Sequence, residues 1–298
     1  MRRDLPRTMP DTWKVKRIIA GCDGTPSGRD ALALAAVLGR PTGADILAVG
    51  VHPDPLGVPY PPGALLHDDA ESVLRDDRHA VAPAARIRAI AGMSPAQALR
   101  HAVEREHAGL LVLGSARRTE GHRVHAGHHA HLLLHDSPCP VALAPHGFHM
   151  HPEELRQIVV GVDDGPEAAA ALRVAQALAA VTAAHVRVVT ALGARRPVPA
   201  GGFEVLADTP EQWEAVAGAR RRHARELLAE RLPAGGVEAE VVEDDPGPAL
   251  VEASSGADLL VIGSRRWGPL ARLVMGGTGE HVVHGAHCPV LVVPRAAA

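Results

Sequence analysis

Short apolar runs alternate along this chain with longer segments in which apolar residues recur at helical spacing. The apolar runs predict strands near 18–22, 46–51, 85–91, 109–113 and 141–144, and again near 157–162, 185–191, 237–242, 258–262 and 290–293. The amphipathic segments predict helices near 31–38, 67–80, 95–107 and 128–135, and again near 166–181, 210–231, 247–255 and 277–285. Strands that alternate with helices form parallel sheets, because each parallel crossover needs a connecting helix. The pattern predicts an α/β fold of two repeated doubly wound domains, each a five-stranded parallel sheet with helices on both faces.

The two halves repeat one another in sequence. RIIAGCDG at 17–24 recurs as QIVVGVDD at 157–164, and GLLVLGSARR at 109–118 recurs as DLLVIGSRRW at 258–267. The offset grows from 140 to 149 positions, so the second copy has nine extra residues in its middle. We predict an N-terminal tail at 1–14, a first domain at 15–148 and a second domain at 149–298, because the polar segment between the copies breaks both periodicities.

Composition limits the classes of partner. Aromatic residues make up only 2% of the chain and the formal net charge is −3, which argues against nucleic-acid binding by base stacking or by a basic face. The apolar runs are too short to cross a membrane, and the start of the chain lacks a signal-peptide core. We therefore expect a cytoplasmic protein with no nucleic-acid or membrane partner. The cysteines Cys22, Cys139 and Cys288 are expected to be reduced thiols in the core.

Two strand ends in each copy bear the candidate binding chemistry. Ligands of doubly wound sheets bind beyond the carboxyl ends of the strands, where the strand order reverses. The first predicted strand ends near Asp23 or near Val162 and Asp163, and the fourth ends at Gly114 or Gly263. A carboxylate there can bind ribose hydroxyls or help to hold a metal ion, and glycines let backbone amides approach phosphate oxygens. The alternative is structural, with an aspartate that satisfies local amides and a glycine that forms a tight turn.

Several segments resemble the universal stress protein family in its tandem form, over about residues 15–295. They are GCDGTPS and GVDDGP after the first strand, GLLVLGSARR and DLLVIGSRR at the fourth, and CPV before the last strand of each copy. Nucleotide-binding members look like G-x2-G-x9-G-[S/T] after the fourth strand. In the second copy Gly263 and Gly276 match, Arg266 replaces the middle glycine, and Gly277 replaces the hydroxyl residue, with Thr278 one place later.

The first copy departs further from that motif. Gly114 and Gly127 match, whereas Arg117 and His128 replace the middle glycine and the hydroxyl residue. The resemblance implies ATP with Mg²⁺ as the ligand, and we favour the second copy because it keeps glycine amides and a hydroxyl. In either copy the arginine could bind a phosphate or fill the groove and exclude ATP. The resemblance also implies that the last strands of the two domains pair in an internal pseudo-dimer, and that two chains can form a homodimer.

On this basis we expect a stress-response regulatory protein with adenine nucleotide as a ligand and with no catalytic set, although weak incidental ATPase activity stays open. One alternative is a nucleotide-free scaffold for an unknown protein partner.

A metal or pH sensor built on the histidine-rich stretch 122–135 is a further alternative. His131 and His135 lie one helical turn apart, a spacing that can chelate Zn²⁺, and the corresponding second-copy pair is Glu280 and His284. No cysteine or carboxylate accompanies the histidines within the stretch, which favours a solvated segment without metal.

One helix start also has a local signature. Ser27, with Asp30 three residues behind it, predicts a capping box at the start of the first helix.

Overall fold

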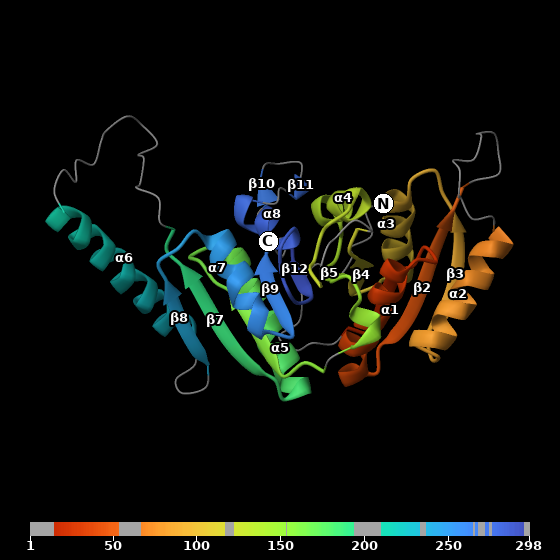
Figure 1. The fold of residues 1–298 in the computed structure, drawn as a ribbon, viewed down its shortest axis with the longest axis horizontal. Helices are drawn as coiled ribbons and strands as arrows, with labels where there is room; N and C mark the ends of the chain where they lie inside the picture. Colours follow the sequence, from red (N-terminus) through yellow and green to blue (C-terminus); the bar gives the residue numbers. More distant parts are fainter. Residues whose placement is uncertain are drawn as a thin grey trace, which may run out of the picture.

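One ten-stranded sheet runs through the computed structural model of the chain (Figure 1). The structure describes residues 15–53, 67–116, 122–152, 154–193, 210–232, 237–264, 266–267, 272–273 and 276–294. The predicted tail at 1–14 lies outside these ranges. Which residue divides the two domains stays a prediction.

The strands follow the repeat. The first half contributes β1 (Arg17–Gly21), β2 (Asp45–His52), β3 (Arg86–Ala91), β4 (Leu110–Gly114) and β5 (Val141–Ala144). The second half contributes β6 (Gln157–Gly161), β7 (His185–Ala191), β8 (Glu238–Val242), β9 (Leu259–Gly263) and β12 (Val290–Val293). Their order is β3-β2-β1-β4-β5-β12-β9-β6-β7-β8. The strands within each half pair in parallel, which confirms the two predicted five-stranded parallel sheets.

The two sheets join at their last strands. β5 and β12 pair antiparallel, with Leu143 opposite Val290 and Val141 opposite Val292. The strand order on one side of this junction is therefore the mirror of the order on the other, and the halves are related by an approximate two-fold axis. This is the internal pairing that the family resemblance implied.

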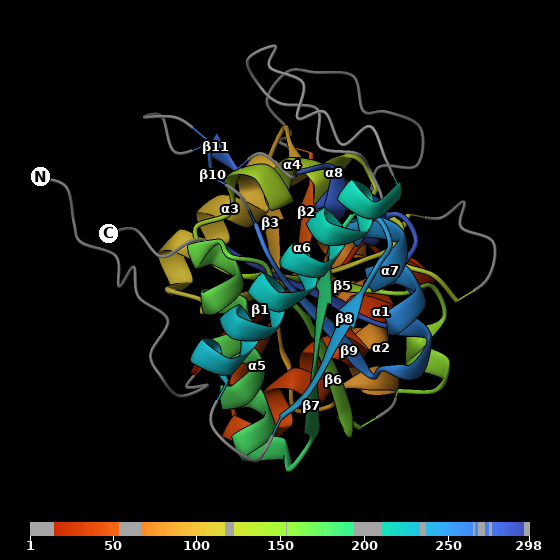
Figure 2. The same ribbon diagram turned by 90° about the vertical axis from the view of Figure 1, so that its left-hand side faces the viewer.

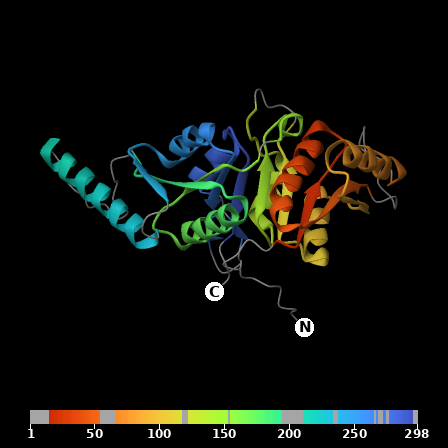
Figure 3. The same cartoon turned by 90° about the horizontal axis from the view of Figure 1, so that it is seen from below.

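Helices cover both faces of the sheet (Figure 3). They are α1 (Pro26–Gly39), α2 (His67–Val81), α3 (Pro95–Glu106), α4 (His128–Asp136), α5 (Pro166–Thr182), α6 (Pro210–Arg231), α7 (Pro246–Ala253) and α8 (Gly277–Val283). Figure 2 looks onto the end of the sheet that carries α6 and β8. None of the helices in the described residues is both long and apolar enough to cross a bilayer. A short ribbon of β10 (Arg266–Trp267) and β11 (Arg272–Leu273) was not predicted.

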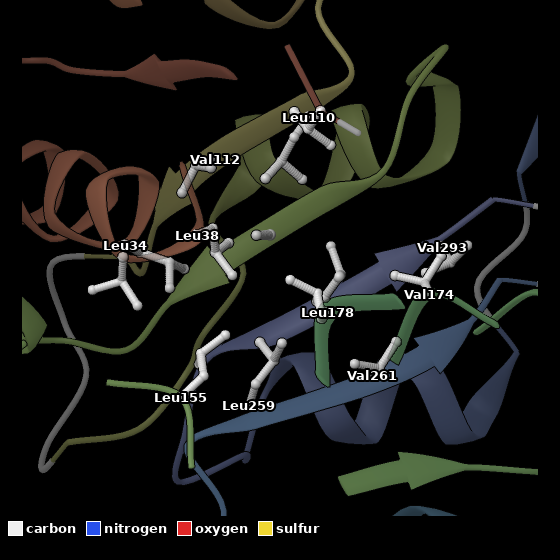
Figure 4. Close-up of a cluster of buried hydrophobic side chains, with 14 of the residues drawn as sticks. Leu34, Leu38, Leu110, Val112, Leu155, Val174, Leu178, Leu259, Val261 and Val293 are labelled. Atoms are coloured by element: carbon white, nitrogen blue, oxygen red, sulfur yellow. The ribbon is translucent and has the colours of Figure 1, made fainter. Parts of the chain in front are cut away.

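Two apolar layers hold the helices on the sheet. Successive strand residues point to opposite faces, so Ile18 packs with one layer and Ile19 with the other. The first layer lies under α1 and α5 and crosses the junction between the halves, as Figure 4 shows with Leu38 of α1 and Leu178 of α5. Burying a leucine completely contributes about 1.5–3 kcal/mol. The two halves therefore share one core rather than meeting through a polar interface.

The capping box predicted at the start of α1 is wrong. The N-cap residue is Thr25, followed by Pro26, and no side chain caps the helix. The Ser27 hydroxyl instead donates to the carbonyl oxygen of Ser115 at 2.6 Å, which ties the first turn of α1 to the end of β4. Proline at the first helical position removes one amide that would otherwise need a partner.

Asp30 holds the segment that joins the two halves. Its side chain is fully buried and accepts hydrogen bonds from the amides of Gly147 at 2.9 Å and His149 at 2.8 Å, and from Nδ1 of His149 at 2.5 Å. A buried carboxylate needs such partners, because it has lost its water. The polar segment between the repeats, including the 3-10 helix Phe148–Met150, is therefore fastened to α1.

Candidate functional site

A cavity of about 510 Å³ opens in the second half at the carboxyl ends of β6 and β9. These strands are neighbours in the sheet, and the chain leaves β6 toward β7 on one side and returns to β9 on the other. The cavity thus lies at the point where the strand order reverses, which is where doubly wound sheets bind ligands. Its volume is within the range of small-molecule sites.

The structure brings the predicted second-copy residues together around this cavity. Val162, Asp163, Gly263, Gly276, Gly277 and Thr278 all line it. Arg266 belongs to β10, where its backbone pairs with Leu273, and its side chain lies outside what the structure describes. Sequence positions more than 100 residues apart therefore meet at one edge of the sheet.

Acidic residues gather on the β6 side of the cavity. Asp163, Asp164 and Glu167 line it, and Oδ1 of Asp163 accepts a hydrogen bond from the amide of Gly165 at 2.9 Å. This turn leads into α5, which has Gly165 as N-cap, Pro166 at its first position and Glu167 in its first turn. The carboxylate of Asp163 thus shapes its own loop and also faces the cavity.

Arg231, the last residue of α6, clamps the same loop from outside. Its guanidinium donates to the carbonyl oxygens of Asp163 at 2.6 Å, Asp164 at 2.7 Å and Gly165 at 3.2 Å. Three convergent carbonyl contacts fix the loop, and they place a cation beside two aspartates. The sequence pattern gave no indication of this contact, because Arg231 follows the loop by 66 residues or more.

Two of the motif glycines have a packing reason that involves no ligand. A Cβ atom at Gly263 would lie 2.6 Å from the carbonyl oxygen of Glu167, and one at Gly114 would lie 2.0 Å from that of Ser27. In both halves the first turn of a helix lies directly against the strand end, so only glycine fits. Gly277 is different, because a Cβ atom there would have no neighbour within 4 Å among the described residues.

Ser264 is a cavity residue that sequence reasoning missed. It is 3% exposed, and its hydroxyl has no hydrogen-bond partner among the described residues. The equivalent hydroxyl of Ser115 donates to Ala144 at 2.7 Å and accepts from the amide of His125 at 3.1 Å. A buried hydroxyl without a partner costs free energy, so the Ser264 hydroxyl is suited to form a hydrogen bond with a ligand in the cavity. The Gly-Ser pair repeated after the fourth strand was the available signal.

The corresponding loop of the first half is engaged by the protein itself. Asp23 accepts from the amide of Thr25 at 3.1 Å, and Gly114 packs on α1 as described above. The amides of Val124 and Ala126 donate to carbonyl oxygens of the second half, those of Ala286 at 2.8 Å and Val283 at 2.9 Å.

The remaining first-copy candidates have separate positions. Gly127 is the N-cap of α4 and His128 is its first residue, whereas Arg117 lies outside the described residues.

The histidine pair on α4 meets the equivalent pair on α8. Nε2 of His131 lies 3.2 and 3.1 Å from the two carboxylate oxygens of Glu280, and Nε2 of His284 lies 3.0 Å from Oε1 of the same side chain. The ring of His135 is centred 4.5 Å from that of His131. The expectation that no carboxylate accompanies these histidines is therefore wrong, because the fold brings Glu280 of the other copy next to His131. In the part of the chain that the structure describes, no three His, Cys, Asp or Glu side chains are arranged around one point as metal ligands.

Sequence comparison finds similarity to one protein family along both halves of the chain. The profile of the universal stress protein family matches residues 14–145 and 154–294. Universal stress protein MT2698 of Mycobacterium tuberculosis is 30% identical over 303 residues, which covers 92% of this chain and 95% of the relative. Universal stress protein Mb2346c of Mycobacterium bovis is 31% identical over 201 residues, 64% of this chain and 66% of the relative, slightly under two thirds of its length.

Solved structures share the fold across both halves. A universal stress protein from Archaeoglobus fulgidus superposes with a TM-score of 0.67 at 19% identity, covering 95% of this chain and all of that one (100%). A putative universal stress protein from Pseudomonas aeruginosa gives 0.65 at 18% identity, covering 94% and 93%. The repeated motifs, the mirrored sheet and the family profile agree over nearly the whole length, and the chain belongs to the universal stress protein family.

Proposed function

We propose that this chain is a stress-response regulatory protein that binds ATP, together with Mg²⁺, in the cavity of its second half. The observation that supports this most is the cavity itself, placed where the strand order reverses and bordered by Asp163 on one side and Gly276 to Thr278 on the other. Membership of the universal stress protein family supports the stress-response part of the proposal.

The chemistry of the walls suits a nucleotide. Val189 and Ala191 of β7 and Leu250 of α7 offer apolar surface for a base. The glycines at the start of α8 have little side-chain bulk, so their backbone amides are accessible to phosphate oxygens. A Cβ at Gly277 would enter open space, and the unpartnered hydroxyl of Ser264 lies in the same cavity, so the residues present fit a polar ligand.

The acidic residues that line the cavity indicate that a cation binds together with the nucleotide. Asp163, Asp164 and Glu167 would repel a bare triphosphate, because like charges at short range raise the free energy. Carboxylate oxygens are ligands that Mg²⁺ prefers, and an aspartate can also accept hydrogen bonds from ribose hydroxyls. We therefore expect ATP to bind tightly only with Mg²⁺, and removal of Mg²⁺ to weaken binding.

We assign nucleotide binding to the second half alone. In the first half the loop after β4 already donates two of its amides to the other copy, and Ser115 has both of its hydrogen bonds satisfied. A purely regulatory role without turnover follows from the expectation that the chain has no catalytic set. A nucleotide-free scaffold is the alternative, in which Arg266 excludes ATP.

The test is a thermal-shift titration with Mg-ATP on the wild type, on Gly277→Val and on Gly256→Val. In the part of the chain that the structure describes, nothing lies within 4 Å of a Cβ atom at either glycine, so we expect neither substitution to disturb the fold, but of the two only Gly277 lines the cavity. ATP at one hundred times its dissociation constant adds about 2.7 kcal/mol to the folded state, which raises the midpoint by a few degrees. We expect that rise in the wild type and in Gly256→Val, and its loss in Gly277→Val.

Two results would contradict the assignment. No rise with millimolar Mg-ATP in the wild type would leave the scaffold as the function. An undiminished rise in Gly277→Val would place the nucleotide elsewhere in the chain. Phosphate release measured in the same samples reports turnover, which we expect to be no more than a weak background.

A further inference from the structure

A second group of donor side chains lies where the two halves meet. His131 and His135 on α4 are four residues apart, and so are Glu280 and His284 on α8, so each pair faces one side of its helix. A separation of 149 residues makes His131 the counterpart of Glu280 and His135 the counterpart of His284. None of the four lines the nucleotide cavity. Figure 1 shows α4 and α8 side by side over the junction.

Backbone contacts fix these two helices relative to each other. The amide of Ala126, just before α4, donates to the carbonyl oxygen of Val283 at the end of α8 at 2.9 Å. The amide of Val124 donates to Ala286 just beyond α8 at 2.8 Å. These contacts hold the start of α4 against the end of α8, and so keep the four side chains near one another.

We propose that His131, His135, Glu280 and His284 bind one Zn²⁺ ion, or a similar divalent cation such as Ni²⁺ or Co²⁺, across the junction between the halves. Imidazole nitrogens and a carboxylate oxygen bind Zn²⁺ at about 2.0–2.2 Å in tetrahedral geometry, which puts neighbouring ligand atoms about 3.3–3.5 Å apart. The distances from Glu280 oxygens to Nε2 of His131 and His284 are 3.0–3.2 Å. These atoms are nearly at the separation that a shared metal requires.

The carboxylate of Glu280 lies between the imidazoles of His131 and His284. It accepts hydrogen bonds from both, which accounts for donors that are close together without yet surrounding one point. When a dication binds, the proton on each Nε2 is exchanged through solvent for one on Nδ1 of the same ring, and the freed Nε2 atoms bind the ion together with His135, whose ring lies against that of His131. We expect side-chain rotation to suffice, because one carboxylate already contacts Nε2 of both His131 and His284.

His125 serves as a positioning residue for the same site. Its Nδ1 lies 3.3 Å from Nδ1 of His284, and only one of the two nitrogens can hold the proton in that contact. A neutral histidine that binds a cation through Nε2 carries its single proton on Nδ1, and in His284 this Nδ1–H donates to Nδ1 of His125. Metal-binding histidines commonly have such a second partner, which fixes the tautomer and the ring orientation.

The site is open to solvent, which favours reversible binding. The side chains of His131, Glu280 and His284 are 38%, 43% and 29% exposed. A cation can enter without unfolding and can keep a water ligand. Binding would link the two halves and stabilise their junction.

The experiment is a calorimetric titration of the full chain, free of any polyhistidine tag, with Zn²⁺, repeated with Co²⁺ to read ligand-field absorption. We expect one Zn²⁺ per chain. His131→Ala and His284→Ala should each weaken binding more than 10-fold, and His125→Ala should weaken it roughly 10-fold, as loss of an outer-shell partner does. The control variants His79→Ala and His101→Ala, exposed on α2 and α3, should bind like the wild type.

Glu280→Gln separates a ligand role from a structural role, because the amide keeps the size of the side chain and one acceptor oxygen. It should lose most of the Zn²⁺ affinity and change the Co²⁺ spectrum while its melting temperature without metal stays near that of the wild type. Absence of stoichiometric Zn²⁺ binding by the wild type overturns the proposal. So does binding that is equally strong in His131→Ala and His284→Ala.

Discussion

Replacing Asp30 with alanine tests how firmly the joining segment is held to the first half. The buried carboxylate accepts three hydrogen bonds, two from backbone amides and one from the ring of His149. Each buried group left without a partner costs about 1–3 kcal/mol. Gly147 and His149 are only half-buried and regain some water, so we expect a total loss of about 3–5 kcal/mol, toward the lower end of the total for three such groups.

Asp30→Asn grades the effect. Asparagine has the same shape but only one acceptor oxygen, and its amide group faces donors, so we expect about half of the loss seen for alanine. Glu154→Ala is the matched control, because Glu154 joins the same segment to Arg40 at the end of α1 by an ion pair of 3.3 Å. The side chains of Arg40 and Glu154 are 68% and 72% exposed. An exposed pair contributes about 0–1 kcal/mol.

Urea denaturation followed by far-ultraviolet circular dichroism measures these free energies. Limited proteolysis gives a second readout, because release of the segment 145–154 should expose it to cleavage in Asp30→Ala before the rest of the chain unfolds. The reasoning is refuted if Asp30→Ala costs no more than Glu154→Ala, because the buried hydrogen bonds would then contribute nothing beyond a surface ion pair.

Two further predictions concern titratable groups. Burial raises the pKa of the Cys139 thiol to about 12, and it also raises the pKa values of the Cys22 and Cys288 thiols. Because the thiolate is the reactive form, Ellman's reagent at pH 8 should label none of the three in the folded protein and all three in urea. A thiol that reacts quickly in the folded protein would contradict this. Hydrogen bonding from Arg88 lowers the pKa of Glu106 below its ordinary value. The ion pairs of Glu106 therefore stabilise the fold at any pH above the ordinary pKa, and this stabilisation is lost as the pH falls through the lowered pKa of the folded state. Glu106→Gln should therefore have a lower free energy of unfolding than the wild type in urea at pH 7. The difference between the two proteins should stay constant at higher pH and should close as the pH falls below about 4.

Local patterns were sufficient to predict the ten strands of the main sheet and the eight α-helices among the described residues. The helix predicted at 95–107 is α3, Pro95–Glu106, and it ends at His107, whose φ of 50° leaves the helical region. Such features depend on residues within one or two turns. The ribbon β10–β11 was not predicted, because each strand has only two residues and shows no periodicity.

The details of the sites depend on contacts that no local pattern contains. Asp30 has the spacing of a capping residue, yet its partners lie 117 and 119 positions away. The histidine stretch lacks a carboxylate in its own sequence, and Glu280 reaches it from 149 positions away. The hydroxyl of Ser115 has two hydrogen-bond partners, whereas that of the equivalent Ser264 has none among the described residues, although both follow the same Gly-Ser motif. The residues of the cavity could be predicted because the sheet topology brings strand ends together, whereas the pairing of their side chains could not.

The antiparallel junction of β5 and β12 has a consequence for how the two halves can differ. In a dimer of identical subunits, a residue near the two-fold axis meets its own copy, so histidine faces histidine and glutamate faces glutamate. Here the axis is only approximate, and position 131 carries an imidazole where its counterpart at 280 carries a carboxylate. Fusion of the two copies into one polypeptide makes this unlike pair possible, and it lets one half keep an open cavity while the other half commits its loop amides to the junction.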